Sequence, residues 1–130
     1  MSGNFDDLVE YRMNRSSETL KEAQTMLDHG FYNAAVNRVY YACFYAVSAL
    51  LHKKGVSASS HKAIRQMFGL HFVKNGIIRK EFGRFFNDLY DRRQTGDYDD
   101  FILFDKETSM KLFLLGKEFV SEIALLIEKL

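Results

Sequence analysis

The chain of 130 residues contains no proline, and this absence constrains its fold more than any other feature. Proline interrupts helices because its ring removes a backbone donor and clashes with the preceding turn. Glycines instead divide the chain into five stretches of helical periodicity, at about residues 5–28, 32–54, 60–74, 77–95 and 105–130. The sequence therefore predicts an all-α fold, an antiparallel up-and-down bundle of about five helices in a single domain over residues 1–130.

Residues that favour helix ends stand between these stretches. Gly30 and Gly55 are placed as C-terminal caps. The run Ser57-Ala58-Ser59-Ser60 supplies candidate N-terminal caps for the third helix, and Asp105 is placed as the N-terminal cap of the fifth. The acidic and aromatic segment 97–101 is expected to form the loop between the fourth and fifth helices.

The second stretch, residues 32–54, is apolar around its whole circumference. Such a helix is buried on every side, so it is either the central helix of the bundle or part of a subunit interface. The fifth stretch also has a wide apolar face. Because a small bundle seldom hides two such faces, we expect a homodimer. The alternative is that the other helices cover both faces within one subunit.

Composition narrows the class of protein further. Hydrophobic residues make up 47% and charged residues 27%, which is typical of a globular domain and not of a disordered chain. The single cysteine cannot form an internal disulfide, and no cysteine–histidine cluster would hold zinc. The acidic N-terminal segment does not fit a signal peptide, and no charge-free apolar run reaches about 18 residues. We therefore expect a cytoplasmic protein that does not span a membrane and uses no metal or cofactor.

The positive charge is concentrated in the middle of the chain. Residues 52–93 carry ten basic and three acidic side chains, whereas the whole chain has a net charge of +1. A basic segment of this kind attracts a phosphate chain. The alternative is a solvated basic face that acidic residues balance elsewhere in the fold.

Four polar or charged side chains on the second and third stretches are candidates for ligand binding. Arg38 lies in the apolar second stretch beside Asn37, with Tyr41 one turn later. A buried arginine needs either a carboxylate or a bound anion, so we consider both a salt bridge to another helix and a phosphate contact. His61 opens the third stretch with Arg65 one turn later, as a surface or capping residue or as a functional one.

The fourth stretch carries two arginines near its end. Phe82, Phe86 and Leu89 form an apolar stripe, Arg93 falls within that stripe, and Arg92 falls at its edge. One interpretation is that the helix dipole and Asp97, Asp99 or Asp100 stabilise these arginines. The other is that Arg92, Arg93 and Tyr98 line a polar cleft for an anionic ligand.

Four segments that follow one another along the chain form a recognisable pattern. They are residues 32–46, Ser60-His61-Lys62, residues 68–76, and Arg92-Arg93-Gln94-Thr95-Gly96-Asp97-Tyr98. They resemble the HEPN domain family, in its small stand-alone prokaryotic group. The resemblance implies a dimeric antiparallel helical bundle, often accompanied by a minimal nucleotidyltransferase. It also implies, for some members, RNase activity in toxin–antitoxin or antiviral systems, through an arginine followed after four to six residues by a histidine.

The chain departs from that RNase motif, because Tyr98 stands where the histidine is expected after Arg93. A tyrosine with a pKa near about 10 is a poor general base at neutral pH. Three hypotheses follow. In the first, a homodimer binds a nucleotide or RNA, beside a nucleotidyltransferase. In the second, the protein is a metal-independent RNase toxin that uses Arg93 with Tyr98 or with a displaced histidine. In the third, it is a dimerisation scaffold. The candidate ligand-binding residues are Arg38, Asn37, Tyr41, His61, Arg92 and Asp97.

Overall fold

The computed structural model describes the backbone of residues 2–98 and 103–130, and the side chains of residues 6–92 and 103–130. Its elements are α1 (Ser2–Asp28), α2 (Tyr32–Lys54), α3 (His61–Phe68), the π-helical turn η1 (Gly69–Val73), α4 (Lys80–Tyr98) and α5 (Lys106–Lys129). These residues contain no strand, so the predicted all-α bundle is confirmed.

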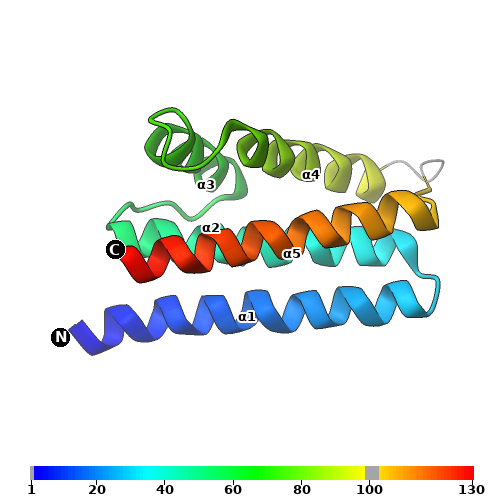
Figure 1. Cartoon of the computed structure of the whole chain (residues 1–130), viewed down its shortest axis with the longest axis horizontal. Helices are drawn as coiled ribbons and strands as arrows, with labels where there is room; N and C mark the ends of the chain where they lie inside the picture. The colour runs from blue at the N-terminus through cyan, green and yellow to red at the C-terminus, as the bar shows by residue number, and fades with distance from the viewer. Residues whose placement is uncertain (1, 99–102) are drawn as a thin grey trace.

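The helices form two layers (Figure 1). The long helices α1, α2 and α5 lie together in one layer, and α3 and α4 cover α2 from the other side. Figure 1 also shows that α1 and α4 run in one direction and α2 and α5 in the opposite one. The neighbours α2 and α5 are therefore parallel to each other, because the short α3–α4 hairpin returns the chain to the starting end.

The predicted helix ends are confirmed at four positions. Gly30 and Gly55 have φ angles of 77° and 83°, in the left-handed region that favours glycine at a helix end. The Ser60 hydroxyl accepts a hydrogen bond of 3.0 Å from the Ala63 amide. The Asp105 carboxylate accepts one of 2.7 Å from the Thr108 amide, and this bond lowers the pKa of Asp105. Each cap satisfies a backbone donor or acceptor that the helix leaves without a partner.

The third stretch is not the single α-helix that was predicted over residues 60–74. It is α-helical only to Phe68 and continues as η1, where the Lys74 amide donates to the Gly69 carbonyl five residues earlier, at 2.8 Å. One widened turn of this kind changes the direction of the side chains that follow it.

The boundaries of the fourth helix are also corrected. It begins at Lys80 and not near residue 77, because the Ile78 amide donates to the Phe72 carbonyl at 2.8 Å and closes the turn after η1. It continues to Tyr98, so residues 97 and 98 are helical and not part of a loop. Gly96 does not end the helix, since an internal glycine costs only about 1 kcal/mol. The rest of the predicted loop, residues 99–101, lies outside the described residues.

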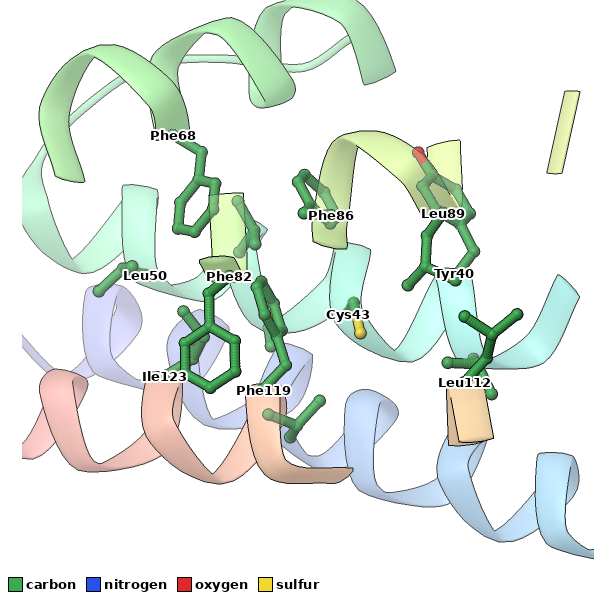
Figure 2. Packing of buried hydrophobic residues seen from close by; sticks show 14 of the residues in the cluster. Tyr40, Cys43, Leu50, Phe68, Phe82, Phe86, Leu89, Leu112, Phe119 and Ile123 are labelled. Carbon is green, nitrogen blue, oxygen red and sulfur yellow. The ribbon is translucent and has the colours of Figure 1, made fainter. Parts of the chain in front are cut away.

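Helix α2 is the central helix of the bundle, as the sequence predicts. Twelve of its residues are buried, and α1, α5, α3 and α4 all contact it. Aromatic rings fill the space above it (Figure 2). Phe119 of α5 contacts the rings of Phe68, Phe82 and Phe86, with centroids 5.6–5.9 Å apart. These contacts join the two layers into one core.

The apolar face of α5 is largely covered by its own chain. Phe113, Phe119, Val120 and Ile123 are buried, although Leu114 and Leu130 are exposed. The alternative in which one subunit covers both apolar faces therefore accounts for most of this face. The homodimer remains a prediction.

Glycine sets the distance between α5 and α2. A Cβ atom at Gly116 would lie 2.6 Å from Cγ1 of Val39, closer than side chains tolerate. Only glycine at this position therefore lets the two parallel helices approach as they do.

Among the described helices, α2 alone is long and apolar enough to cross a membrane by length and composition. Of its most apolar window, 67% is buried inside the molecule, which is expected of a core helix. This finding is weak evidence for a membrane span.

Candidate functional site

A histidine surrounded by aromatic rings lies where α2, α3 and α4 meet. His61 Nδ1 and the Tyr40 hydroxyl share a hydrogen bond of 2.7 Å. The imidazole stacks on Phe44 with centroids 4.2 Å apart and meets the edge of Tyr41 at 5.8 Å. Tyr90 of α4 contacts Tyr40 at 6.1 Å. We call these five residues, His61, Tyr40, Tyr41, Phe44 and Tyr90, the His61 cluster.

Local sequence explains how the His61 cluster forms. Tyr40 and Phe44 are four residues apart and Tyr41 lies beside them, so all three fall on one side of α2. Tyr40 is completely buried and fixes the cluster to the core. The Ser60 cap starts α3 at His61 and so holds the imidazole in the first turn. Tyr41, Phe44, His61 and Tyr90 are each half-buried, so their rings are in part accessible.

Arginines lie at both ends of this run of rings. The Arg38 guanidinium is 5.2 Å from the Tyr41 ring centroid, and the Arg65 guanidinium is 4.4 Å from that of Tyr90. Both distances are within the range of cation–π attraction. A continuous series of contacts therefore runs from Arg38 through the rings of the His61 cluster to Arg65.

The structure pairs Arg38 with a carboxylate, as the salt-bridge alternative predicts. Arg38 Nη1 lies 3.2 Å from Glu22 Oε1 on α1, and Arg38 Nη2 donates to the Asn37 side-chain oxygen at 3.1 Å. The prediction of a buried arginine is wrong, because 30% of the Arg38 side chain is exposed. A helix in the first layer of a two-layer bundle leaves one edge open to solvent. Ion pairs at such partly exposed positions contribute only about 0–1 kcal/mol.

Four of the predicted ligand-binding residues, Arg38, Asn37, Tyr41 and His61, are brought together in this way. Arg92 is half-buried and forms an ion pair of 2.8 Å with Asp88 on its own helix. The backbones of Arg93, Asp97 and Tyr98 belong to α4, but their side chains lie outside the described residues. Their part in a cleft with Arg38 stays a prediction.

Sequence reasoning missed Tyr40, Phe44 and Tyr90 as members of the site. The first two belong to a helix that is apolar on all sides, so both were counted as core residues. The available signal was the tyrosine and phenylalanine spacing at positions 40, 41 and 44, which places three rings beside Asn37 and Arg38. The pairing with His61 depends on tertiary contacts that no spacing reveals.

Two further groups near α2 have structural roles. Cys43 is fully buried as a small core residue, and burial raises the pKa of its thiol far above the usual value. Arg15 of α1 lies 5.3 Å from the Tyr45 ring, and a hydrogen bond with Tyr45 raises the pKa of Arg15. Within the part of the chain that the structure describes, no three His, Cys, Asp or Glu side chains are grouped as metal ligands.

A family model for the HEPN domain matches residues 9–126. The chain belongs to the HEPN domain family. It is 39% identical over 125 residues to a UPF0332 protein of Thermotoga maritima, which covers 96% of this chain and 95% of that protein. It is also 32% identical over 114 residues to the protein named "Putative toxin MJ0142" of Methanocaldococcus jannaschii, covering 88% and 78% of the two chains.

A solved structure shares the fold. The crystal structure of an HEPN domain protein (TM0613) from Thermotoga maritima aligns with a TM-score of 0.70 at 17% identity, over 92% of this chain and 99% of that one. The family predicted from the four sequence segments and the helical bundle it implies are thus confirmed. In this HEPN chain, the end of α4 carries Arg93 followed by Tyr98 where the RNase pattern expects histidine.

Proposed function

We propose that this HEPN protein is a homodimeric module that binds single-stranded RNA or a nucleotide at the His61 cluster. The observation that supports this function is the series of ring contacts from Tyr41 through the buried Tyr40 to Tyr90, with a guanidinium at each end. Arg38 lies over Tyr41 and Arg65 over Tyr90, and both of these outer rings are half-buried. Single-stranded RNA is recognised by aromatic and arginine side chains on which unstacked bases lie. Arginines beside these rings supply charge for the neighbouring phosphates.

The ion pairs of this site do not oppose the proposal. Exposed pairs are weak, so the Arg38 guanidinium exchanges Glu22 for a phosphate at little cost. Arg93 follows Tyr90 by three positions in α4, and the proposed cleft includes Arg92, Arg93, Asp97 and Tyr98.

The direct test is RNA binding by the Tyr41→Ala variant. Stacking contributes about 1–3 kcal/mol per base, so we expect the variant to bind a labelled single-stranded RNA at least about fivefold more weakly in fluorescence anisotropy. Tyr11→Ala is the matched control, because Tyr11 is 62% exposed on α1, away from the His61 cluster. Equal affinities of the two variants would remove the His61 cluster from the binding site.

Competition with ATP separates the two ligand classes. If ATP displaces the RNA at equal concentration of phosphate groups, the site takes a free nucleotide. If it does not, the site requires a strand. The homodimer is tested separately by sedimentation equilibrium, and a monomer at every concentration would contradict that part of the proposal.

A metal-independent RNase toxin is the second candidate function. The names of two relatives, "Putative toxin MJ0142" and "Putative toxin MJ0605", favour it. In this reaction the ribose 2′-hydroxyl attacks the adjacent phosphate, Arg93 stabilises the charge that develops on the phosphorane, and a nearby group moves the proton. Tyr98 is a weak base for this step. We propose His61 as the displaced histidine of the second hypothesis, provided that folding brings it close to Arg93.

Expression without a partner tests this second candidate. The toxin hypothesis predicts growth arrest and RNA cleavage that persist in a metal chelator and are lost in Arg93→Ala. Lys111→Ala, which removes one exposed positive charge from α5, serves as the control. Purified protein that binds RNA but leaves it intact would contradict the toxin function and leave the binding module.

The third hypothesis, a scaffold, is favoured by the carboxylate partners of Arg38 and Arg92. It predicts no RNA binding at all, which the anisotropy experiment measures. A nucleotidyltransferase partner and a cytoplasmic location remain part of our proposal. Co-purification of the tagged protein from its own cells tests the partner, and fractionation of the same cells tests the location.

A further inference from the structure

A hollow of about 290 Å³ lies on the outer layer, where α3, η1 and α4 meet. Four of the side chains that line it are basic: Arg65 of α3, Lys74 after η1, and Lys80 and Arg84 of the first turns of α4. Its floor is apolar and includes Val73. We call this hollow the basic pocket. It is separate from the His61 cluster, and only Arg65 belongs to the surroundings of both.

Three of the four cations of the basic pocket lack a carboxylate partner among the described side chains, whereas Arg65 lies 3.9 Å from Asp91. Among the side chains of residues 6–92 and 103–130, no carboxylate lies within 4.0 Å of Lys74, Lys80 or Arg84. None of the residues that line the hollow in this part of the chain is acidic. Like charges around one hollow repel each other, so the arrangement gains stability when an anion enters.

The backbone around the basic pocket is specialised. The π-helical turn η1, which ends the helical segment that begins with α3, supplies Gly69 and Val73 to the lining. Gly83 also lines the basic pocket, and a Cβ atom at this position would lie 2.8 Å from Cγ1 of Val73. Glycine thus lets α4 approach η1 closely. The first turns of α4 also contribute to the lining, through Lys80, Gly83 and Arg84.

We propose that the basic pocket binds a phosphodiester of a single-stranded RNA that continues from the His61 cluster. This inference rests on the proposed function, because Arg65 contacts Tyr90 on one side and lines the pocket on the other. Lys74, Lys80 and Arg84 hold the phosphate. The volume of the hollow is near the lower limit of about 300 Å³ for ligand sites and suits one phosphate with its sugar.

The salt dependence of RNA binding tests the proposal. The variant Lys74→Gln/Lys80→Gln/Arg84→Gln is compared with wild type on a single-stranded RNA of about twelve nucleotides. Each phosphate contact to a single strand contributes about 0.7 to the slope of log affinity against log salt. We expect the slope of the variant to fall by about 1–2, and its affinity at about 50 mM salt to fall at least tenfold.

Lys21→Gln/Lys111→Gln/Lys129→Gln is the matched control. It removes three exposed positive charges from α1 and α5, and none of the three lines the basic pocket. An equal loss in both triple variants would mean that only total charge matters and would overturn the proposal. Unchanged binding by the pocket variant would also overturn it. Circular dichroism of both variants establishes that each is folded.

The source of the phosphate is identified by NMR. The amide signals of Gly69 and Gly83 report on the pocket walls, and we expect RNA to shift both in the wild type. Pyrophosphate or ATP that shifts them as strongly at equal phosphate concentration would overturn the assignment to a strand.

A wild type that binds no RNA overturns this inference and the proposed function together. If Tyr41→Ala weakens binding and the pocket variant does not, only this inference fails. If the pocket variant weakens binding and Tyr41→Ala does not, RNA binds at the basic pocket and not at the His61 cluster.

Discussion

Positive charges on the two sides of Arg65 have different surroundings. Beside the His61 cluster, Arg38 is held by Glu22 and Asn37, and within the cluster His61 is fixed by the buried Tyr40. In the basic pocket, Lys74, Lys80 and Arg84 lie on exposed surface without a carboxylate among the described side chains. The first region is therefore continuous with the core and set by folding. The second depends on the backbone around η1, and its side chains contribute little to the fold.

The largest effect on stability is expected at Tyr40, the member of the His61 cluster that is completely buried. Replacing a fully buried aromatic side chain by alanine costs about 3–5 kcal/mol, so Tyr40→Ala should lower the free energy of unfolding by this amount in urea denaturation. Tyr11→Ala, at an exposed position of α1, should change it by less than about 0.5 kcal/mol. Similar losses in both variants would contradict the idea that the first region is part of the core.

A smaller loss of stability is expected at Ser60, the N-cap residue that precedes His61. Ser60→Ala removes the hydrogen bond to the Ala63 amide and should cost about 1 kcal/mol. Ser57→Ala, in the exposed segment before α3, is the matched control and should be neutral. Thermal unfolding measures both. If Ser60→Ala is as stable as the control, the cap does not hold His61 in position.

The ion pair of Arg38 should contribute still less. A double-mutant cycle of Arg38→Gln and Glu22→Gln is expected to give a coupling energy of about 0.2–1 kcal/mol in favour of the pair, because both side chains are partly exposed. The coupling should decrease with added salt. A coupling above about 2 kcal/mol would show that this pair is not exchangeable for a phosphate.

The smallest effect on stability is expected in the basic pocket. Neutralising Lys74, Lys80 and Arg84 with glutamine removes mutual repulsion and no ion pair within the described residues, so the unfolding free energy should stay within about 0.5 kcal/mol of wild type or rise slightly. Urea denaturation at low salt measures the change. A clear loss of stability would mean that these side chains support the fold, and the contrast between the two regions would disappear.

Much of the fold follows from the sequence because its signals are local. The capping residues Gly30, Gly55, Ser60 and Asp105 each act on backbone groups a few positions away. Gly30, Gly55 and Asp105 were predicted, and Ser60 was one of the candidates in the run from Ser57 to Ser60. The apolar circumference of α2 also predicts its central place, since burial of such a surface leaves few alternatives. The widened turn η1 was not predicted, because hydrogen bonds across five residues have no characteristic residue pattern.

The candidate site was predicted less completely. Arg38, Asn37 and Tyr41 were found because they are neighbours on one helix. Their contact with His61 depends on how α3 packs on α2, and the surroundings of Lys74, Lys80 and Arg84 depend on which charges share a surface. The concentration of positive charge in residues 52–93 was visible in the sequence, but its distribution between paired and free side chains was not.

The number of residues in the π-helical turn η1 determines how the charged side chains after it are oriented relative to α3. An extra residue in a helix rotates everything after it by about 100° relative to the preceding turns. Deleting a single residue between Gly69 and Val73 would restore regular α-helical hydrogen bonding and swing Lys74 around the axis relative to Arg65. Natural insertions and deletions at this point would thus rearrange the charged surface of related proteins without altering one charged residue.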